Sequence, residues 1–471
     1  MVFSSFEFLF RFLPAFLIIY FITPKKFRNA VLFLGSIAFY TYGEAQYVLL
    51  LLASVTVNYV IARSMYKTPE DGRGRRQAVL LILALCYDFG MLFFFKYSGL
   101  TTKLPLGISF YTFQIAAYVI DVYRGIVPAE KSYVNLGTYL TMFPQLIAGP
   151  IVLHNEVLPQ FEDKNNWKVN SDNMAHGLYM FAAGLVKKAV IADTLSVSVA
   201  WGYSHLGNDL TSMEAILTML AYTFQIYFDF SGYCDMATGL GYMFNIHIPM
   251  NFNSPYKALS IVDFWKRWHL TLTRFLRTYV YFPLGGSRKG TIRTYFNIIM
   301  VFLVSGLWHG ANWTFIFWGF LHGIGNAVTR MFKKQWESMH EVIQWAATFL
   351  FVNITWIFFR ADSISQAFTF IKRILGFKNL NVRGPFLQTF QLKEFHLIYS
   401  HIPVLNKVMA SIRGVDALIM LTGMLFLCLN FKNNQEMKFR PTVSMAVFTV
   451  FCMVWGIFTL SGVSEFLYFN F

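Results

Sequence analysis

Two histidines and one tyrosine carry side chains suited to moving a proton during a transfer reaction. His309 lies in a long uncharged run, and His269 closes the string Asp-Phe-Trp-Lys-Arg-Trp-His forty positions earlier. A neutral imidazole within reach of a hydroxyl group can take its proton and act as a general base. Tyr468 supplies the only hydroxyl group among the last six residues.

The run that contains His309 is too long to be a single membrane-spanning helix. Residues 294–329 hold no Lys, Arg, Asp or Glu. As one helix these residues would extend about 54 Å, whereas the hydrocarbon core of a bilayer is roughly 30 Å thick. We therefore expect a break at Gly306, Gly310 and Asn312, which would place His309 beside a helix discontinuity inside the membrane.

An ionisable side chain at such a depth is costly unless it meets polar partners or water, so His309 is a catalytic candidate. The alternative is a hydrogen-bonded structural histidine, and the residue pattern alone leaves both roles open. For His322, thirteen residues further on, the structural role is favoured.

The composition predicts a polytopic membrane protein. Of 471 residues, 56% are hydrophobic and only 13% are charged, against about 25% charged in a typical soluble domain. The net charge of +15 indicates cytoplasmic loops facing anionic lipid rather than nucleic-acid binding. The four cysteines form no C-x-x-C pair, and P-loop, H-E-x-x-H and G-x-S-x-G motifs are absent, so we expect no metal site, nucleotide hydrolysis or elbow serine.

The apolar runs predict an all-α protein with about ten to twelve crossings plus re-entrant and interfacial helices. Residues 6–22 form a retained first span, and 136–152, interrupted by prolines and a glycine, are short enough to be re-entrant. Lysines and arginines after the first and third spans and at 432–440 indicate cytoplasmic loops there, so both termini should be extracytoplasmic. Residues 378–413 should form a polar, irregular external loop.

A basic segment, 257–293, precedes the long run and contains eight basic residues against the single acid Asp263. Helical periodicity predicts an interfacial helix on the cytoplasmic surface, with its aromatic and basic residues on opposite faces. The basic face either anchors the helix to anionic lipid or binds a phosphate-bearing cytosolic donor. Its members are Lys266, Arg267, Arg274 and Arg277.

Several long strings resemble the membrane-bound O-acyltransferases, and most closely the bacterial branch that contains the membrane subunits of alginate and peptidoglycan O-acetylation. They are spread over the middle of the chain, and the resemblance implies that the whole chain is one membrane domain. The strings are Phe-Pro-Gln-Leu-Ile-Ala-Gly-Pro at 143–150, Gln-Ile-Tyr-Phe-Asp-Phe-Ser-Gly-Tyr at 225–233, Phe-Trp-Lys-Arg-Trp-His-Leu-Thr-Leu at 264–272, Tyr-Phe-Pro-Leu-Gly-Gly-Ser-Arg-Lys-Gly at 281–290, and Gly-Leu-Trp-His-Gly-Ala at 306–311.

The resemblance implies a catalytic role for His309, because the histidine of the W-H-G motif is catalytic in that family, and an accompanying role for His269. It also implies a ring of helices around a thinned centre, with a tunnel in which a cytosolic thioester meets an acceptor from the other side. The segment around Asp229 would line that tunnel, or Asp229 would be a hydrogen-bonded structural residue. Acetyl-CoA would be the donor substrate, with no permanently bound cofactor, and a separate SGNH-like extracytoplasmic transferase would carry acetyl to a polysaccharide.

The last six residues, 466–471, are similar to the terminal F-I-Y-F-x-F motif of this branch, whose tyrosine accepts the acyl group. That similarity implies that Tyr468 is an acyl acceptor on the extracytoplasmic side. The residue pattern alone favours an interfacial aromatic belt over an acceptor role.

Two other functions stay open at this stage. The D-alanyl branch of the same family serves teichoic acids and takes its acyl group from a carrier protein. A transporter or flippase would perform no covalent chemistry, but it would show repeated hydropathy in its two halves, and no such repeat is apparent. Alginate, peptidoglycan and other exopolysaccharides all stay open as the acceptor polymer.

Overall fold

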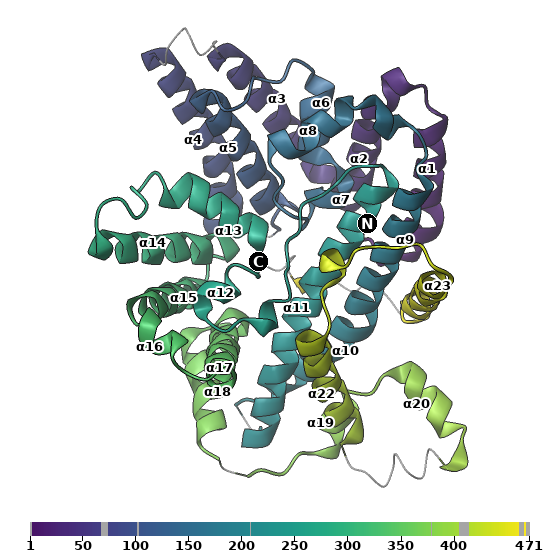
Figure 1. Cartoon of the computed structure of the whole chain (residues 1–471), viewed down its shortest axis with the longest axis vertical. Coiled ribbons are helices and arrows are strands. Elements are labelled where there is room, and N and C mark those ends of the chain that lie inside the picture. Colours follow the sequence, from purple (N-terminus) through teal and green to yellow (C-terminus); the bar gives the residue numbers. More distant parts are fainter. Residues whose placement is uncertain are drawn as a thin grey trace. The chain divides into compact units, whose positions relative to one another are not determined.

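The protein is described by a computed structural model that covers residues 2–66, 74–100, 103–207, 209–377, 379–404, 414–460 and 466–467. Within these ranges every regular element is a helix, as the apolar composition predicts (Figure 1). The contacts divide the chain into two compact units. The first comprises Met1–Ala182, Tyr233–Met250 and Phe439–Val450, and the second comprises Ala183–Gly232, Asn251–Lys438 and Phe451–Phe471.

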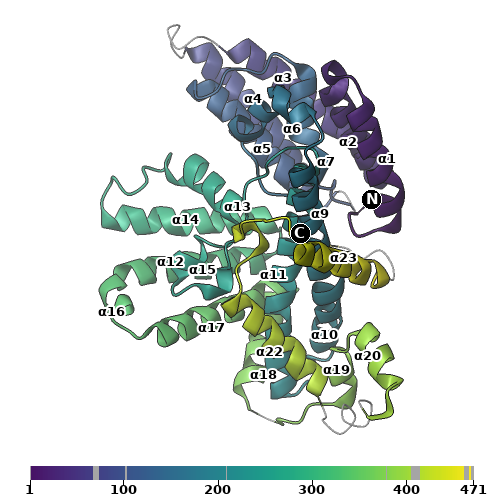
Figure 2. The same cartoon turned by 45° about the vertical axis from the view of Figure 1, so that its right-hand side comes forward.

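The first unit contains the helices drawn in purple and blue in Figures 1 and 2. They are α1 (Leu13–Ile22), α2 (Arg28–Glu44), α3 (Val48–Met65), α4 (Arg75–Tyr97), α5 (Ile108–Arg124), α6 (Tyr133–Thr141), α7 (Phe143–Leu146) and α8 (His154–Glu162). Three helices contribute residues to both units: α9 (Ser171–Leu185), α11 (Ser212–Met243) and α23 (Val443–Phe458).

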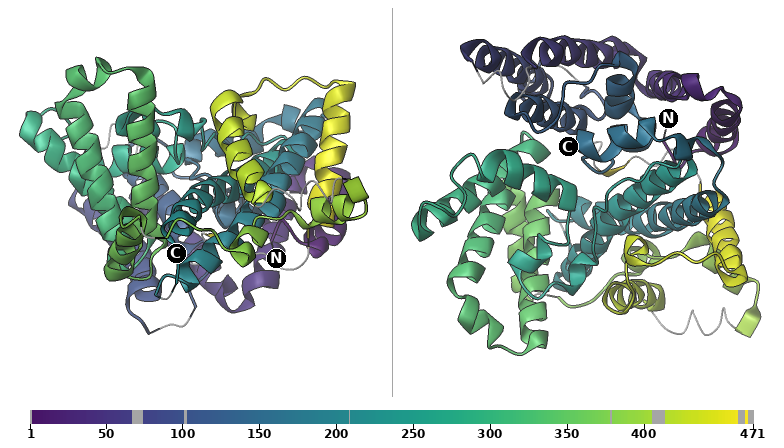
Figure 3. Two further views of the ribbon diagram at one scale, coloured as in Figure 1. Left: turned by 90° about the horizontal axis from the view of Figure 1, so that it is seen from below. Right: turned by 45° about the horizontal axis from the view of Figure 1, so that its top comes forward.

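The second unit contains the following helices, most of them drawn in teal or green, which Figure 3 shows from two further directions. They are α10 (Asp193–Ser204), α12 (Ile261–Phe264), α13 (Leu270–Leu276), α14 (Thr291–His309), α15 (Trp313–Met331), α16 (Lys333–Glu337), α17 (Glu341–Arg360), α18 (Ile364–Leu375), α19 (Gly384–Gln388), α20 (Lys393–Ser400) and α22 (Val415–Asn430). Two π-helical stretches also belong to it, Val186–Ala192 and Arg277–Tyr281.

Five segments of the described chain are long and apolar enough to cross a membrane: Lys25–Met65, Arg75–Tyr97, Thr291–His309, Glu341–Arg360 and Val415–Glu436. These segments support a multi-pass membrane protein. Other apolar runs form shorter helices, such as the 10-residue α1 and the 17-residue α5. The predicted total of ten to twelve crossings therefore stays a prediction.

The predicted break within 136–152 is present. Helix α6 ends at Thr141, and the short α7 begins at Phe143 with Pro144 in its first turn. Proline has no N–H to donate and clashes with the preceding turn, so it is tolerated at a helix start but not in a helix interior. The apolar run is thereby divided into two short helices.

The single interfacial helix predicted within 257–293 is wrong. The segment contains α12, then turns, then α13 and a π-helical stretch, and His269 between them has a φ of +47°. The helix is interrupted because two N–H groups bond to another part of the chain. The N–H of Leu270 donates to the backbone carbonyl of Asn251 at 3.0 Å, and the N–H of Thr271 donates to the Asn251 side chain at 3.2 Å. These bonds replace the intrahelical bonds that a continuous helix would need at this point.

The segment 378–413 is predicted to be irregular, but its described part forms α19 and α20.

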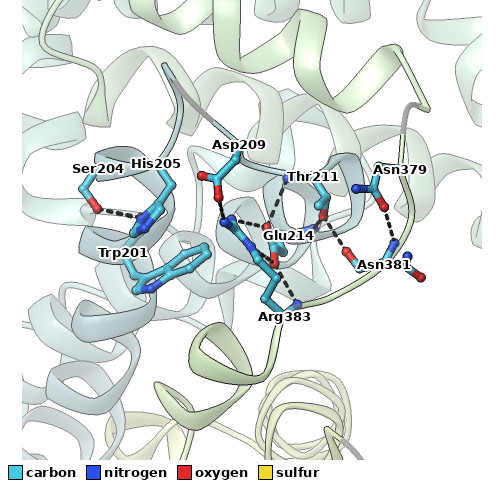
Figure 4. A network of polar contacts seen from close by, with 9 residues as sticks. All are labelled: Trp201, Ser204, His205, Asp209, Thr211, Glu214, Asn379, Asn381 and Arg383. Carbon is cyan, nitrogen blue, oxygen red and sulfur yellow. Dashed lines mark hydrogen bonds and ion pairs between the residues drawn. The ribbon is translucent and has the colours of Figure 1, made fainter.

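Arg383, just before α19, connects this segment to the start of α11 (Figure 4). Its guanidinium donates to both oxygens of Glu214, at 2.9 and 2.7 Å, and it also pairs with Asp209 and lies 4.5 Å from the centre of the Trp201 ring. Hydrogen bonding to Glu214 raises the pKa of Arg383 above its ordinary value, so this connection stays charged at every physiological pH.

Candidate functional site

The break in the uncharged run lies where the glycines and Asn312 predict it. Helix α14 ends at His309, and α15 begins at Trp313. The side chain of Asn312 caps α15 by accepting a hydrogen bond from the N–H of Thr314 at 3.2 Å. Short polar side chains at this position satisfy N–H groups that have no intrahelical partner, so the start of α15 is encoded locally.

Glycines allow α14 and α15 to approach each other closely. A Cβ atom on Gly306 would collide with the carbonyl oxygen of Phe315, and one on Gly319 would collide with the carbonyl oxygen of Phe302. The two helices therefore pack backbone against backbone next to the break. This close packing fixes the end of α14, which carries His309.

His309 is held in one tautomer by its own helix. The side chain is buried, and its Nδ1 atom lies 2.7 Å from the carbonyl oxygen of Ser305. A carbonyl oxygen can only accept, so Nδ1 must carry the hydrogen and donate it. The lone pair of the neutral ring is then on Nε2, which is the nitrogen that can accept a proton in a reaction.

His269 is buried and has an unusual backbone conformation. Its φ of +47° lies in the left-handed region, which residues other than glycine seldom adopt. Such strain persists only where the surrounding structure imposes it, and it is concentrated at functional sites. At His269 it places the imidazole at the start of α13 rather than along the face of a continuous helix.

The tautomer of His269 is set by Asn251, a residue that the sequence interpretation missed. The Oδ1 atom of Asn251 accepts from the backbone N–H and the hydroxyl group of Thr271, at 3.2 and 2.9 Å. Because a backbone N–H can only donate, the Asn251 atom that faces it must be the oxygen. His269 Nδ1, 3.2 Å from the same oxygen, therefore donates to it, and the lone pair of His269 is on Nε2.

Asn251 is itself held by the segment just after α22. Gln435 accepts the N–H of Asn251 at 3.3 Å, and the side-chain amide of Asn433 donates to the carbonyl oxygen of Phe252 at 2.8 Å. Ser254 donates to Glu436 at 2.5 Å. A segment about 180 positions away in the sequence thus supports the loop that orients His269. No local pattern marks Asn251, since its partners are so distant.

The two histidines are brought to the same aromatic cluster, and Trp308 contacts both. The ring of Trp308 lies 6.0 Å from that of His269 and 4.8 Å from that of His309. Phe230 of α11 lies 4.8 Å from His269, and Trp318 of α15 lies 5.1 Å from His309. Aromatic walls of this kind exclude water and strengthen electrostatic interactions inside.

His322 is buried near the same cluster but has both ring nitrogens engaged. The indole N–H of Trp265 donates to Nδ1 at 3.1 Å, so Nε2 must carry the hydrogen, and it lies 3.0 Å from the hydroxyl oxygen of Thr355. That hydroxyl group donates onward to the carbonyl oxygen of Val352 at 2.9 Å. Because both ring nitrogens of His322 are engaged in hydrogen bonds, this histidine fits the structural role that the sequence favours.

The four predicted donor-binding residues do not form one uniform face. Lys266 and Arg277 are exposed, whereas Arg267 and Arg274 are partly buried. Arg267 is paired with Asp263 at 3.0 Å. Only part of the positive charge in this segment is therefore fully open to an anionic partner.

Tyr468 lies outside the described residues. The two residues before it, Phe466 and Leu467, are described, and Phe466 is 1% exposed. The N–H of Leu467 donates to Asp229 Oδ2 at 3.1 Å. The interpretation of Tyr468 as an acceptor stays a prediction.

A helical, apolar protein with a buried histidine at a broken helix, and a second histidine in the same aromatic cluster, has the features of an acyltransferase embedded in a membrane. Residues 128–364 match the model of MBOAT, the membrane-bound O-acyltransferase family. The chain belongs to this family, and it is therefore an acyltransferase rather than a transporter.

Similar proteins fall into two groups. The chain is 40% identical over 431 residues to a peptidoglycan O-acetyltransferase of Helicobacter pylori, which covers 81% of both chains. It is 39% identical over 399 residues to the probable alginate O-acetylase AlgI of Pseudomonas aeruginosa, which covers 80% of this chain and 75% of the relative. A teichoic acid D-alanyltransferase of Bacillus subtilis is 25% identical over 263 residues, which covers 54% of this chain and 66% of the relative.

Proposed function

We propose that the protein is an O-acetyltransferase of the cell membrane that moves an acetyl group from cytosolic acetyl-CoA to an extracytoplasmic polysaccharide. The observation that carries this proposal is the pairing of His309 and His269, each with Nδ1 committed to a fixed acceptor, in one buried aromatic cluster. Acetyl is favoured over D-alanyl because the O-acetylating relatives are about 40% identical over four fifths of the chain, whereas the D-alanylating one is 25% identical over about half.

His309 is the general base in this proposal. Its Nε2 takes the proton of the acceptor hydroxyl group as that oxygen attacks the thioester carbonyl carbon. A carbon–oxygen bond forms, the carbon–sulfur bond breaks, and the proton passes from Nε2 to the leaving thiolate. The products are an acetyl ester and the CoA thiol, and His309 is returned to its neutral form.

His269 is the second member of the pair. In its neutral form Nε2 accepts a hydrogen bond but cannot donate one, because Nδ1 already carries the hydrogen. His269 can therefore orient an N–H or O–H group of the acyl donor, but its neutral form cannot polarise the thioester carbonyl by donating a hydrogen bond to it. The exposed Lys266 and Arg277 would attract the phosphates of the donor.

The acceptor hydroxyl group is that of Tyr468 in this proposal, and the acyl group is passed on to a separate SGNH-like extracytoplasmic transferase. The order of leaving groups supports it: a thiol has a pKa of about 8.5 and a phenol about 10, and a sugar alkoxide is a poorer leaving group than either. Each transfer, from thioester to aryl ester to alkyl ester, runs downhill. The basic loops favour an extracytoplasmic position for both termini, the side on which the acyl group would be passed to that partner.

The test is to incubate the purified full-length protein with acetyl-CoA that carries a labelled acetyl group. Covalent label on the protein, mapped by mass spectrometry to Tyr468, is the expected result. Labelled acetyl-CoA that binds without covalent transfer of its acetyl group would contradict the proposal. Transfer only from an aminoacylated carrier protein would assign the chain to the D-alanyl branch.

A further inference from the structure

A buried ion pair, separate from the histidine cluster, joins the π-helical stretch Val186–Ala192 to α11. Lys188 Nζ lies 2.7 Å from Asp229 Oδ1 and 2.8 Å from Asp193 Oδ1. Lys188 is 1% exposed and Asp229 is 2% exposed, whereas the side chain of Asp193 is 27% exposed. Two buried charges in an apolar helical protein are expensive to desolvate, so they mark a functional role more often than a stabilising one.

The backbone around Lys188 departs from a regular helix. Residues Val186–Ala192 are π-helical, between the ends of α9 and α10. One extra residue per turn re-aims the side chains, and such stretches are frequent at functional sites. Opposite this stretch, α11 packs so closely at Gly232 that a side chain would not fit, because a Cβ atom there would come within 2.8 Å of the carbonyl oxygen of Gly184.

Both members of the pair also contact the C-terminal segment. The second carboxylate oxygen of Asp229 accepts the backbone N–H of Leu467 at 3.1 Å. The ammonium group of Lys188 lies 4.7 Å from the centre of the Phe466 ring, within the range of a cation–π interaction. One carboxylate thus bridges a buried lysine and the main chain of the tail, and Phe466 is buried against the lysine.

The turn of α11 that carries Asp229 also contacts the histidine cluster. Phe230, the residue after Asp229, contacts the ring of His269 at 4.8 Å. Tyr468 is the residue after Leu467 in the sequence. A contact that fixes Leu467 on Asp229 therefore restricts the region that the Tyr468 hydroxyl group can reach.

We infer that Lys188 and Asp229 form a receptor for the C-terminal segment and act as positioning residues for acyl transfer to Tyr468. The part of this inference that concerns acyl transfer rests on the proposed function. The docking of the tail on the ion pair does not, because it depends only on the contacts of Phe466 and Leu467.

Hydrogen exchange of the C-terminal peptide, measured by mass spectrometry on the full-length protein, tests the docking. Asp229→Asn leaves one side-chain oxygen where the carboxylate has two. We expect this oxygen to accept from the Lys188 ammonium group, which leaves the amide nitrogen facing the Leu467 N–H, so that N–H loses its acceptor. We expect that N–H to exchange about tenfold faster, the size expected from losing one hydrogen bond to a charged group. Asp193→Asn is the matched control, since it removes the charge of the other partner of Lys188 but leaves the tail contact, and its C-terminal peptide should exchange as in the parent.

Leu467→Pro tests the same contact from the tail and leaves the buried pair intact. It removes the donor N–H, whereas Leu467→Ala keeps it. We expect Leu467→Pro to speed exchange of the remaining tail amides and Leu467→Ala to leave them near the parent rate. The proposed docking of the C-terminal segment would be wrong if exchange of the tail amides were unchanged in both Asp229→Asn and Leu467→Pro. It would also be wrong if Asp193→Asn accelerated that exchange as much as Asp229→Asn does.

The role in acyl transfer is read out separately, as formation of acetyl-Tyr468 from labelled acetyl-CoA. Asp229→Asn should lower its rate at least tenfold while the Kd for acetyl-CoA is unchanged; a rate equal to that of the parent would overturn the positioning role. Tyr468→Phe separates the two proposals, because it should leave tail exchange unchanged. If it also left polymer acetylation intact, the acceptor role in the proposed function would fail while the receptor would stand.

Discussion

The imidazole of His309 has Nδ1 committed to the Ser305 carbonyl oxygen, so the lone pair of the neutral ring is on Nε2, the basic position. If that position takes the acceptor proton, His309→Ala should reduce acetyl transfer by about 10²–10⁴-fold, the usual contribution of a general base. Initial rates of label transfer from acetyl-CoA, together with thermal unfolding of the purified variant, measure the loss and show whether the fold is intact. A variant that folds normally and keeps more than a few per cent of the parent rate would remove His309 from this role.

The Asn251 side chain controls His269 without being able to react itself. Asn251→Ala removes the acceptor for His269 Nδ1 and for both donors of Thr271, so the imidazole can turn and change tautomer. We expect a loss of about 10²-fold in rate, the scale of a small misplacement of a catalytic group. Asn251→Asp keeps an acceptor oxygen at this position and should retain more activity than Asn251→Ala. The reverse order would mean that Asn251 does not act through His269.

At the scale of elements, the close approach of α14 and α15 is the feature that fixes the broken helix. Replacing glycine by alanine inside a helix normally stabilises it by roughly 0.5–1 kcal/mol. In Gly319→Ala the new methyl group meets the backbone of α14, and overpacking of this kind costs about 1–3 kcal/mol. We expect a lower unfolding temperature and reduced acetyl transfer.

Gly423→Ala in α22 is the matched control for that variant. Nothing lies within 4 Å of a Cβ atom built on Gly423, so its unfolding temperature should be unchanged or slightly raised. If both variants had the same unfolding temperature, the two helices would not be packed as closely at Gly319 as the structure places them.

The basic segment before α14 contains only two exposed members of the predicted set, Lys266 and Arg277. Replacing both by Glu should raise the KM for acetyl-CoA with little change in kcat, and the effect should shrink as salt is added. The charge-neutral pair of changes to Gln should have a smaller effect. An unaltered KM combined with poorer membrane insertion would assign these residues to lipid anchoring instead.

At the scale of the whole molecule, the sequence predicts those features that depend on length and composition. The helical class follows from the apolar composition. The break beside His309 follows from an uncharged run that is too long for one span and has glycines at its middle. Residues 257–293 do not form the continuous helix that their apolar periodicity predicts, because a period of 3.6 describes a helix only where the backbone hydrogen bonds stay within the segment. At His269 they are replaced by bonds to Asn251.

Long-range partners explain the rest of what the sequence could not predict. Gln435, which accepts the N–H of Asn251, lies 184 positions further along the chain, and the tail contact joins Asp229 to Leu467 over 238 positions. Neither pair has a local signature, because amides and carboxylates are common in loops and the partner of the second is a backbone N–H. Asp229 itself was predicted either to line the tunnel or to be a hydrogen-bonded structural residue, and its contacts with Lys188 and the tail are hydrogen bonds.

The chain as a whole would carry both the base and the acceptor of the first transfer, so a change at the acceptor alone should stop the export of acetyl groups. Tyr468→Phe keeps the aromatic ring and removes only the hydroxyl group, so packing of the tail should be unaffected while no ester can form. We expect export of acetyl groups to the polymer to be abolished, with expression and acetyl-CoA binding at the parent level. Acetylation of the polymer measured in cells that carry the variant, with Tyr468→Ser as a poorer acceptor for comparison, provides the test. Normal polymer acetylation by Tyr468→Phe would show that the acyl group leaves the membrane by a route that does not involve this tail.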